Sequence, residues 1–146
     1  MSTTEEKLLI SISRMRNLLF RDLDTIFSSN GLTTTQFAVL EVLYHKGTLC
    51  VGDIQRLILG TSGNIPLVIK NLEKEGLVLR KKSETDRRIS MIDLTEKGLL
   101  LIKKVYPLQK QRLSELFQDV SNKEKKALTQ SLLEVYQIVL STKEKI

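Results

Sequence analysis

The order of apolar and polar positions predicts a long amphipathic helix at the start of the chain. Thr3 and Glu6 form a capping box, in which each side chain can hydrogen-bond to the backbone of the other residue, and Gly31 follows the last apolar position. Between them, apolar residues recur at the spacing of one helix face. We therefore expect one helix over residues 3–30, with an apolar stripe of Leu8, Ile12, Met15, Leu19, Leu23 and Ile26.

A second helix is predicted to follow directly. Thr33 and Gln36 form another capping box, the next turns are apolar, and Gly47 closes the pattern. His45 falls in the last turn, where a cation interacts favourably with the helix dipole, so we expect a structural role for it. Residues 49–51 are apolar and predict a short strand.

Two more amphipathic helices are predicted at the other end of the chain. Thr95 can cap a helix that reaches about Asp119, with a kink at Pro107, and Ser121 with Glu124 caps the last helix. The last helix has a stripe of Leu128, Leu132, Val135 and Val139. The terminal stripes fit either a homodimer interface or the core of a monomer, and the pattern alone does not decide between them.

The segment between these helices predicts two short helices followed by a basic hairpin. The helices are expected at Asp53–Leu59 and at about Ser62–Glu75, with Gly60 between them and Gly76 as the left-handed residue that ends the second. In the second helix, Ile65, Val68, Ile69 and Leu72 can face a core, which leaves Asn64, Lys70, Asn71 and Lys74 outside.

Residues 77–82 then read as a strand, 83–86 as a turn and 87–94 as a second strand. Basic residues flank the turn: Arg80, Lys81 and Lys82 before it, Arg87 and Arg88 after it. The predicted fold class is mostly α with a small β-wing, a winged helix-turn-helix flanked by N-terminal and C-terminal helices.

A helix beside a basic hairpin suits duplex DNA, because the major groove admits a helix and the minor groove attracts arginine. The formal charge of +6 favours a polyanionic partner, although an anionic membrane surface would also attract it. Aromatic residues make up only 5% of the chain, which argues against base stacking with single strands. The alternative is a solvated helix and a charged surface hairpin.

Composition narrows the function further. No apolar run approaches the length of a membrane span and the first residues are acidic, so we expect a cytoplasmic protein with no membrane partner. The chain has one His and one Cys, and it contains no zinc-ligand spacing, no P-loop and no nucleophile-elbow motif. We therefore predict no enzymatic activity, no cofactor and no metal site.

Four motifs of this sequence resemble the MarR family of bacterial transcriptional regulators. They are Val51–Leu57, Asn71–Val78, Asp86-Arg87-Arg88 and the Leu94–Gly98 signature Leu-Thr-x-x-Gly, and Gly31–Leu40 is also similar to the family. The resemblance implies a single domain over residues 1–146, with a DNA-binding part at 32–98 and dimerisation helices at 3–30 and 96–141. It implies a homodimer on a pseudo-palindromic duplex operator, with half-sites about one helical turn apart.

The chemistry of the side chains divides the predicted DNA contacts into those with phosphates and those with bases. Thr61, Ser62, Gly63 and Asn64 begin the second short helix, where free N–H groups attract phosphate and short polar side chains reach base edges. Asn64 can read adenine, but it is also a common first-turn residue without a DNA partner. Lys70, Lys82 and Arg87 are predicted to contact phosphates. Arg88 matches the family's minor-groove arginine, and Asp86 is placed to orient it.

Pro66 leaves the start of that helix open. If Thr61 is the N-cap, Pro66 falls beyond the first turn and removes a backbone hydrogen bond. If Asn64 is the N-cap, Pro66 occupies a first-turn position that proline tolerates. The residue types are compatible with both starts, and Pro66 belongs to the predicted DNA surface in either case.

The resemblance also implies a regulated repressor, because family members typically bind an anionic or phenolic aromatic ligand between the dimer helices and the winged motif. The apolar candidates to line such a pocket are Met15, Leu19, Phe37 and Leu40, with Arg16 and Arg14 as carboxylate partners. The alternative is that the apolar residues are plain core and the arginines plain surface.

Control through a thiol is the other alternative. Some relatives sense oxidants with a cysteine in the N-terminal helix, but Cys50 is the only cysteine of this chain and lies elsewhere. Its apolar neighbours predict a buried packing thiol. A winged helix that contacts another protein and does not bind DNA is a further alternative, which the basic wing disfavours.

Overall fold

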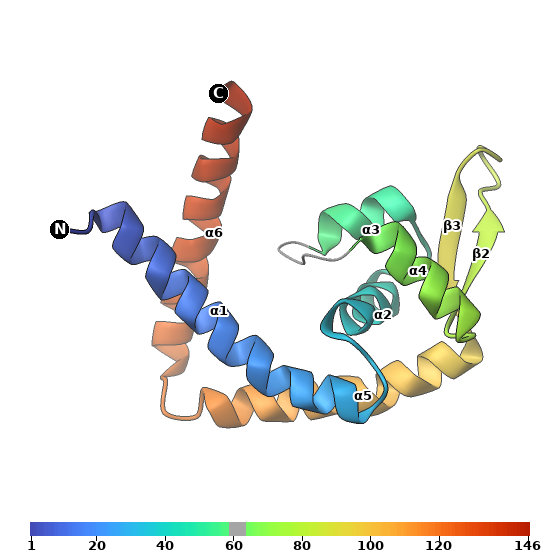
Figure 1. The fold of residues 1–146 in the computed structure, drawn as a ribbon, viewed down its shortest axis with the longest axis horizontal. Helices are drawn as coiled ribbons and strands as arrows, with labels where there is room; N and C mark the ends of the chain where they lie inside the picture. Colours follow the sequence, from blue (N-terminus) through green and yellow to red (C-terminus); the bar gives the residue numbers. More distant parts are fainter. Residues whose placement is uncertain (59–63) are drawn as a thin grey trace. The chain divides into compact units, whose positions relative to one another are not determined.

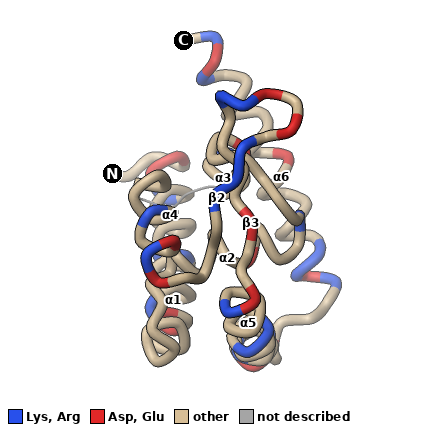
Figure 2. Tube along the Cα trace, turned by 90° about the vertical axis from the view of Figure 1, so that its right-hand side faces the viewer, with Lys and Arg blue, Asp and Glu red and all other residues tan. Residues whose placement is uncertain are grey.

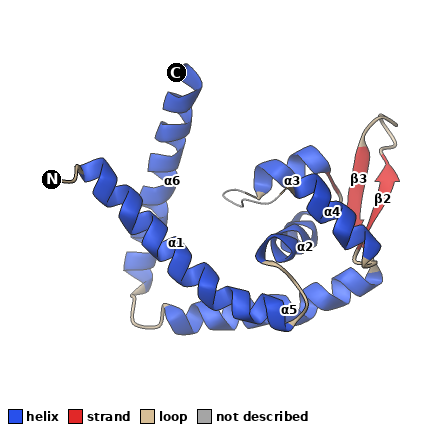
Figure 3. Cartoon of the chain, in the orientation of Figure 1, coloured by secondary structure: helices blue, strands red, loops and turns tan. Residues whose placement is uncertain are grey.

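The computed structural model describes residues 1–58 and 64–146 and shows a mostly helical chain with one small antiparallel sheet (Figures 1 and 3). The predicted fold class is confirmed. The elements are α1 (Thr4–Ser29), α2 (Thr34–Lys46), β1 (Leu49–Cys50), α3 (Val51–Leu57), α4 (Ile65–Lys74), β2 (Val78–Lys82), β3 (Ser90–Leu94), α5 (Glu96–Leu116) and α6 (Asn122–Lys145). The chain forms two compact units, Met1–Lys110 and Gln111–Ile146.

The helix ends follow the predicted capping residues. Thr3 and Glu6 form the first capping box, and the Thr33 N–H donates to the Gln36 side chain at 3.0 Å in the second. The Ser121 hydroxyl accepts from the N–H of Glu124 at 3.1 Å. Gly31, Gly47 and Gly76 all have positive φ, of 75°, 82° and 71°, which explains why each helix pattern stops at glycine.

The boundaries of the first short helix and the end of α5 differ from those predicted. The first short helix begins at Val51 rather than Asp53 and ends at Leu57, because Cys50 already has the extended backbone of an N-cap and Asp53 lies in the first turn. The helix α5 ends at Leu116 and not at about Asp119. After Leu116 the chain forms a tight turn, in which the N–H of Val120 donates to the carbonyl oxygen of Phe117 at 3.0 Å.

The second wing strand was also predicted too long. It begins at Ser90, because residues 86–89 form a turn in which the N–H of Ile89 donates to the carbonyl oxygen of Asp86 at 3.0 Å. The central strand β3 pairs antiparallel with β1 and β2, in the order β1-β3-β2. The short strand predicted at residues 49–51 is confirmed as Leu49–Cys50.

The core of Met1–Lys110 lies among α2, α3, α4 and the sheet. Its fully buried residues include Val39, Leu40, Ile54, Ile69, Leu72 and Ile92. The rings of Phe27 and Phe37 stack with centroids 4.2 Å apart, which joins α1 to α2. These contacts form a rigid support for α4 and the hairpin.

The Leu94–Gly98 signature forms the junction between α4, the wing and α5. The Thr95 hydroxyl donates to the carbonyl oxygen of Gly76 at 2.6 Å and accepts from the N–H of Gly98 at 3.0 Å. Gly98 lies directly against Leu77, since a Cβ there would overlap the Leu77 carbonyl oxygen and lie 3.0 Å from its carbonyl carbon. The glycine of this signature is therefore required by the close approach of the Leu77 backbone, and the threonine hydroxyl links the end of α4 to the start of α5.

The unit Gln111–Ile146 contains the end of α5 and all of α6. Each residue of α6 is described, and none of them is buried in the single chain, although the helix carries Leu133, Ile138 and Val139 with 56%, 66% and 59% of their surface exposed. Within residues 1–58 and 64–146, no helix has the length and apolar character of a membrane span.

Candidate nucleic-acid interface

The helix α4 starts at Ile65, with Asn64 as its N-cap. The Asn64 side-chain oxygen accepts from the N–H of Leu67 at 3.4 Å, and Pro66 stands in the first turn, where no intrahelical bond is lost. The sequence left two starts open, with Thr61 or Asn64 as the N-cap, and the structure has Asn64. The predicted start near Ser62 was therefore too early. The candidate contacts Thr61, Ser62 and Gly63 lie outside the described residues.

One face of α4 is left for a partner. Ile65, Ile69 and Leu72 are buried, whereas Pro66, Leu67, Lys70 and Lys74 are exposed. Leu67, Lys70 and Lys74 follow one another at spacings of three and four residues, so they share one stripe opposite the buried one. Asn71, which was expected on the outside, is half-buried.

The tip of the hairpin holds one arginine in a defined orientation. Asp86 accepts three hydrogen bonds from Arg88: from its backbone N–H at 3.0 Å, and from Nε and an Nη at 3.1 Å each. These bonds lower the pKa of Asp86, so the carboxylate stays ionised to a lower pH than that of an ordinary aspartate. The Arg88 side chain is nevertheless 90% exposed, which leaves its outer edge available to a partner.

The other wing cations, which belong to the Lys and Arg residues coloured blue along the trace in Figure 2, fall into two groups according to their ion pairs. Arg80 is bound to Glu73 of α4 at 3.0 and 3.1 Å, and Lys81 lies 3.6 Å from Asp93. Lys82 and Arg87 are exposed and form no ion pair with any residue in the described part of the chain. Lys82 and Arg87 therefore remain as candidate phosphate contacts, whereas Arg80 fastens the wing to α4.

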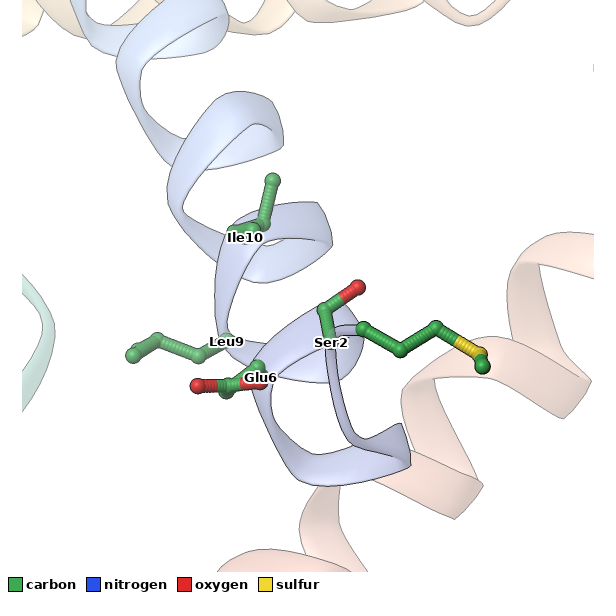
Figure 4. A pocket seen from close by; sticks show the side chains of 5 residues that line it. Ser2, Glu6, Leu9 and Ile10 are labelled. Atoms are coloured by element: carbon green, nitrogen blue, oxygen red, sulfur yellow. The ribbon is translucent and has the colours of Figure 1, made fainter.

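The predicted ligand residues do not share one environment. Phe37 and Leu40 are buried in the core, whereas Met15 is 45% exposed on α1, Leu19 is half-buried, and Arg16 lies over the ring of Phe20 at 5.1 Å. A shallow hollow of about 480 Å³ lies elsewhere on α1, lined by Met1, Ser2, Glu6, Leu9 and Ile10 (Figure 4).

Cys50 is half-buried, so the expectation of a fully buried thiol was wrong. The pKa of Asp53 is lowered mainly by its hydrogen bond with Arg56 and further by one with the Cys50 thiol. Within the described ranges, no three His, Cys, Asp or Glu side chains are grouped as a metal site.

Comparison with known proteins agrees with this geometry. The family model of the MarR family matches residues 32–90. The HTH-type transcriptional regulator MhqR of Bacillus subtilis is 36% identical over 129 residues, which cover 88% of this chain and 89% of that protein.

Two solved structures show the same fold. AbsC, a MarR family transcriptional regulator from Streptomyces coelicolor, has a TM-score of 0.84 at 22% identity, covering 97% of this chain and 98% of its own. An organohalide-sensing transcriptional regulator in its 2,4-dichlorophenol-bound form also has a TM-score of 0.84, at 20% identity, covering 95% of this chain and 83% of its own.

Proposed function

The chain belongs to the MarR family of transcriptional regulators, and from this premise we propose that it is a homodimeric repressor that binds a pseudo-palindromic duplex operator. In this proposal α4 enters the major groove and the wing reaches the adjacent minor groove. Residues 32–98 form the DNA-binding part, and residues 3–30 and 96–141 hold the dimer. The relatives named above are transcriptional regulators, which agrees with a protein that is not an enzyme.

The observation that carries the proposal is the Asp86–Arg88 arrangement. Three hydrogen bonds orient an arginine whose side chain stays 90% exposed at the tip of a hairpin. A guanidinium held in this way loses less conformational entropy on binding, and the negative potential of a narrow minor groove attracts it. Lys82, Arg87 and Lys70, which form no ion pair with residues 1–58 or 64–146, can contact the neighbouring phosphates.

The replacement Arg88→Ala should weaken operator binding by about 1–3 kcal/mol, with fold and dimer unchanged. Fluorescence anisotropy with a labelled promoter fragment, repeated over a range of salt concentrations, measures this effect. Wild-type protein should show a log affinity that falls steeply with log salt, because phosphate neutralisation dominates binding. Asp86→Asn should have an intermediate effect, since it keeps the Arg88 charge and loses the rigid hold on it.

Lys145→Ala is the matched control, because it also removes one positive charge and lies in the last turn of α6. It should bind as the wild type does at physiological salt, where distant charges are screened. Wild-type affinity for Arg88→Ala would show that the wing arginine has no part in binding. Promoter binding that is absent or independent of salt would refute the repressor proposal itself.

A small aromatic or phenolic ligand is the regulator we propose. Support comes from the solved neighbour bound to 2,4-dichlorophenol. On this chain Met15 and Leu19 lie one turn apart on α1 and Arg16 directly follows Met15, so apolar surface and a guanidinium could meet a phenolate there. Phe37 and Leu40 could only pack behind the residues that contact the ligand, because both are buried in the single chain.

Release of the operator should therefore follow a phenolic ligand and not oxidation of Cys50. The measurement compares wild type with Cys50→Ser in the same anisotropy assay, with salicylate-like phenols, peroxide or quinone added. Both proteins should respond equally to phenols and weakly to oxidants, since Cys50 is half-buried and oxidation of a thiol requires access to it. Oxidant release of wild type alone would identify Cys50 as the sensor.

A further inference from the structure

The first turn of α4 carries an apolar side chain that serves no part of the core. Leu67 is 51% exposed, whereas Ile65, Ile69 and Leu72 of the same helix are at most 3% exposed. Pro66 beside it is also exposed. The outer surface of this turn is therefore an apolar tip, which we define as the side chains of Pro66 and Leu67.

The surroundings of the apolar tip are cationic. Lys70 and Lys74 continue the stripe of Leu67 along α4, and both are exposed. Glu73 of the same helix is bound by Arg80 at 3.0 and 3.1 Å, so its charge is offset. An apolar tip followed by two lysines fits a polyanion that also presents an apolar group, and does not fit an uncharged apolar partner.

Duplex DNA has one such group in its major groove. Each base pair there presents hydrogen-bond donors and acceptors, and only thymine adds an apolar group, its C5-methyl. The N-terminal residues of a recognition helix are those that reach base edges. Leucine can make no hydrogen bond, so the methyl group is the only base-edge feature that complements it.

We propose that Leu67 is a specificity-determining residue that reads the C5-methyl group of a thymine in each operator half-site. Pro66 keeps the turn rigid and widens the apolar contact, while Lys70 and Lys74 hold the neighbouring phosphates. This inference rests on the proposed DNA-binding function and deepens it, because it states which base chemistry each half-site must contain.

The test removes the methyl group without changing the base pairing. A duplex operator is first selected with wild-type protein from a random pool, and each thymine in it is then replaced singly by deoxyuridine. One position in each half-site should lose about three- to tenfold in affinity, the order expected for burying one methyl group. At that position, Leu67→Ala should bind the thymine and uracil duplexes equally, and Leu67→Met should retain part of the discrimination.

Ile146→Ala is the matched control, since Ile146 is a fully exposed apolar residue that lies outside α4 and outside the residues proposed to bind DNA or hold the dimer. It should preserve the full thymine-to-uracil ratio. Thermal unfolding of Leu67→Ala should match that of the wild type, because the side chain is half exposed and contributes little to the core. This makes loss of discrimination distinct from loss of the fold.

Three outcomes would overturn the inference. Equal affinity of wild type for every uracil duplex would show that no methyl group is read. Discrimination that persists in Leu67→Ala would assign the reading to another residue. Reduced affinity of Leu67→Ala with no uracil effect in wild type would place Leu67 on the sugar–phosphate backbone. Failure to select any duplex would instead refute the proposed DNA-binding function.

Discussion

Replacing Gly98 by alanine should lower the free energy of unfolding by about 3 kcal/mol, near the upper end of what overpacking costs. The added Cβ would overlap the carbonyl oxygen of Leu77, which is backbone and has no rotamer by which to escape. The junction of α4, the wing and α5 would have to move apart, with loss of the Thr95 hydrogen bonds to Gly76 and Gly98. Urea unfolding followed by circular dichroism measures the change.

Gly52→Ala is the control for this substitution. Gly52 lies in the first turn of α3, its φ is not positive, and a Cβ there would meet no atom within 4 Å. Alanine costs less conformational entropy than glycine in a helix, so this variant should be unchanged or more stable by about 0.5–1 kcal/mol. Equal stability of the two variants would mean that the approach of Gly98 to Leu77 is not tight.

The parts of the fold that sequence predicts well are those set by local chemistry. A capping box such as Thr33 with Gln36 acts within one turn, and a glycine such as Gly76 marks a positive φ wherever it lies. The order helix, helix, hairpin follows from the change in apolar period and needs no knowledge of distant contacts. These features were sufficient to predict the winged helix-turn-helix.

One error arose at a local turn and another at an ion pair between two elements. The segment 87–89 was predicted as part of the second wing strand. It belongs to the tip of the hairpin, because Asp86 accepts hydrogen bonds from the N–H groups of Arg88 and Ile89. The sequence places Arg80 among the basic residues of the wing. In the structure its side chain is bound to Glu73 of the preceding helix. Ion pairs between elements depend on their packing, which a linear pattern does not contain.

The predicted ligand residues show a similar limit. The helix α2 is buried on several sides, with Gln36, Phe37, Val39, Leu40 and Leu43 all inside, so its sequence lacks one clear apolar stripe. The sequence could not tell an apolar residue that lines a pocket from one that fills the core. The structure separates Phe37 and Leu40, which are buried, from Met15, which is exposed.

The double replacement of Leu132 and Val139 by glutamate should convert the proposed dimer into a monomer. These residues belong to one stripe of α6, are 43% and 59% exposed in the single chain, and would each have a charge buried in an interface. Sedimentation should report about the chain mass of 16.7 kDa in place of twice that mass. Operator affinity should fall by about 10²–10⁴-fold, because the second half-site is no longer bound by a linked partner.

The control adds the same two charges on another side of the same helix. Gln130 and Gln137 are exposed and lie about 140–160° around α6 from Leu132 at 3.6 residues per turn. The replacement Gln130→Glu with Gln137→Glu should therefore leave the dimer intact and weaken DNA binding only through the change in net charge. If the Leu132 and Val139 variant remained a dimer with wild-type operator affinity, the stripe on α6 would not be the interface. A wild-type protein that bound the operator as a monomer would refute the dimer altogether.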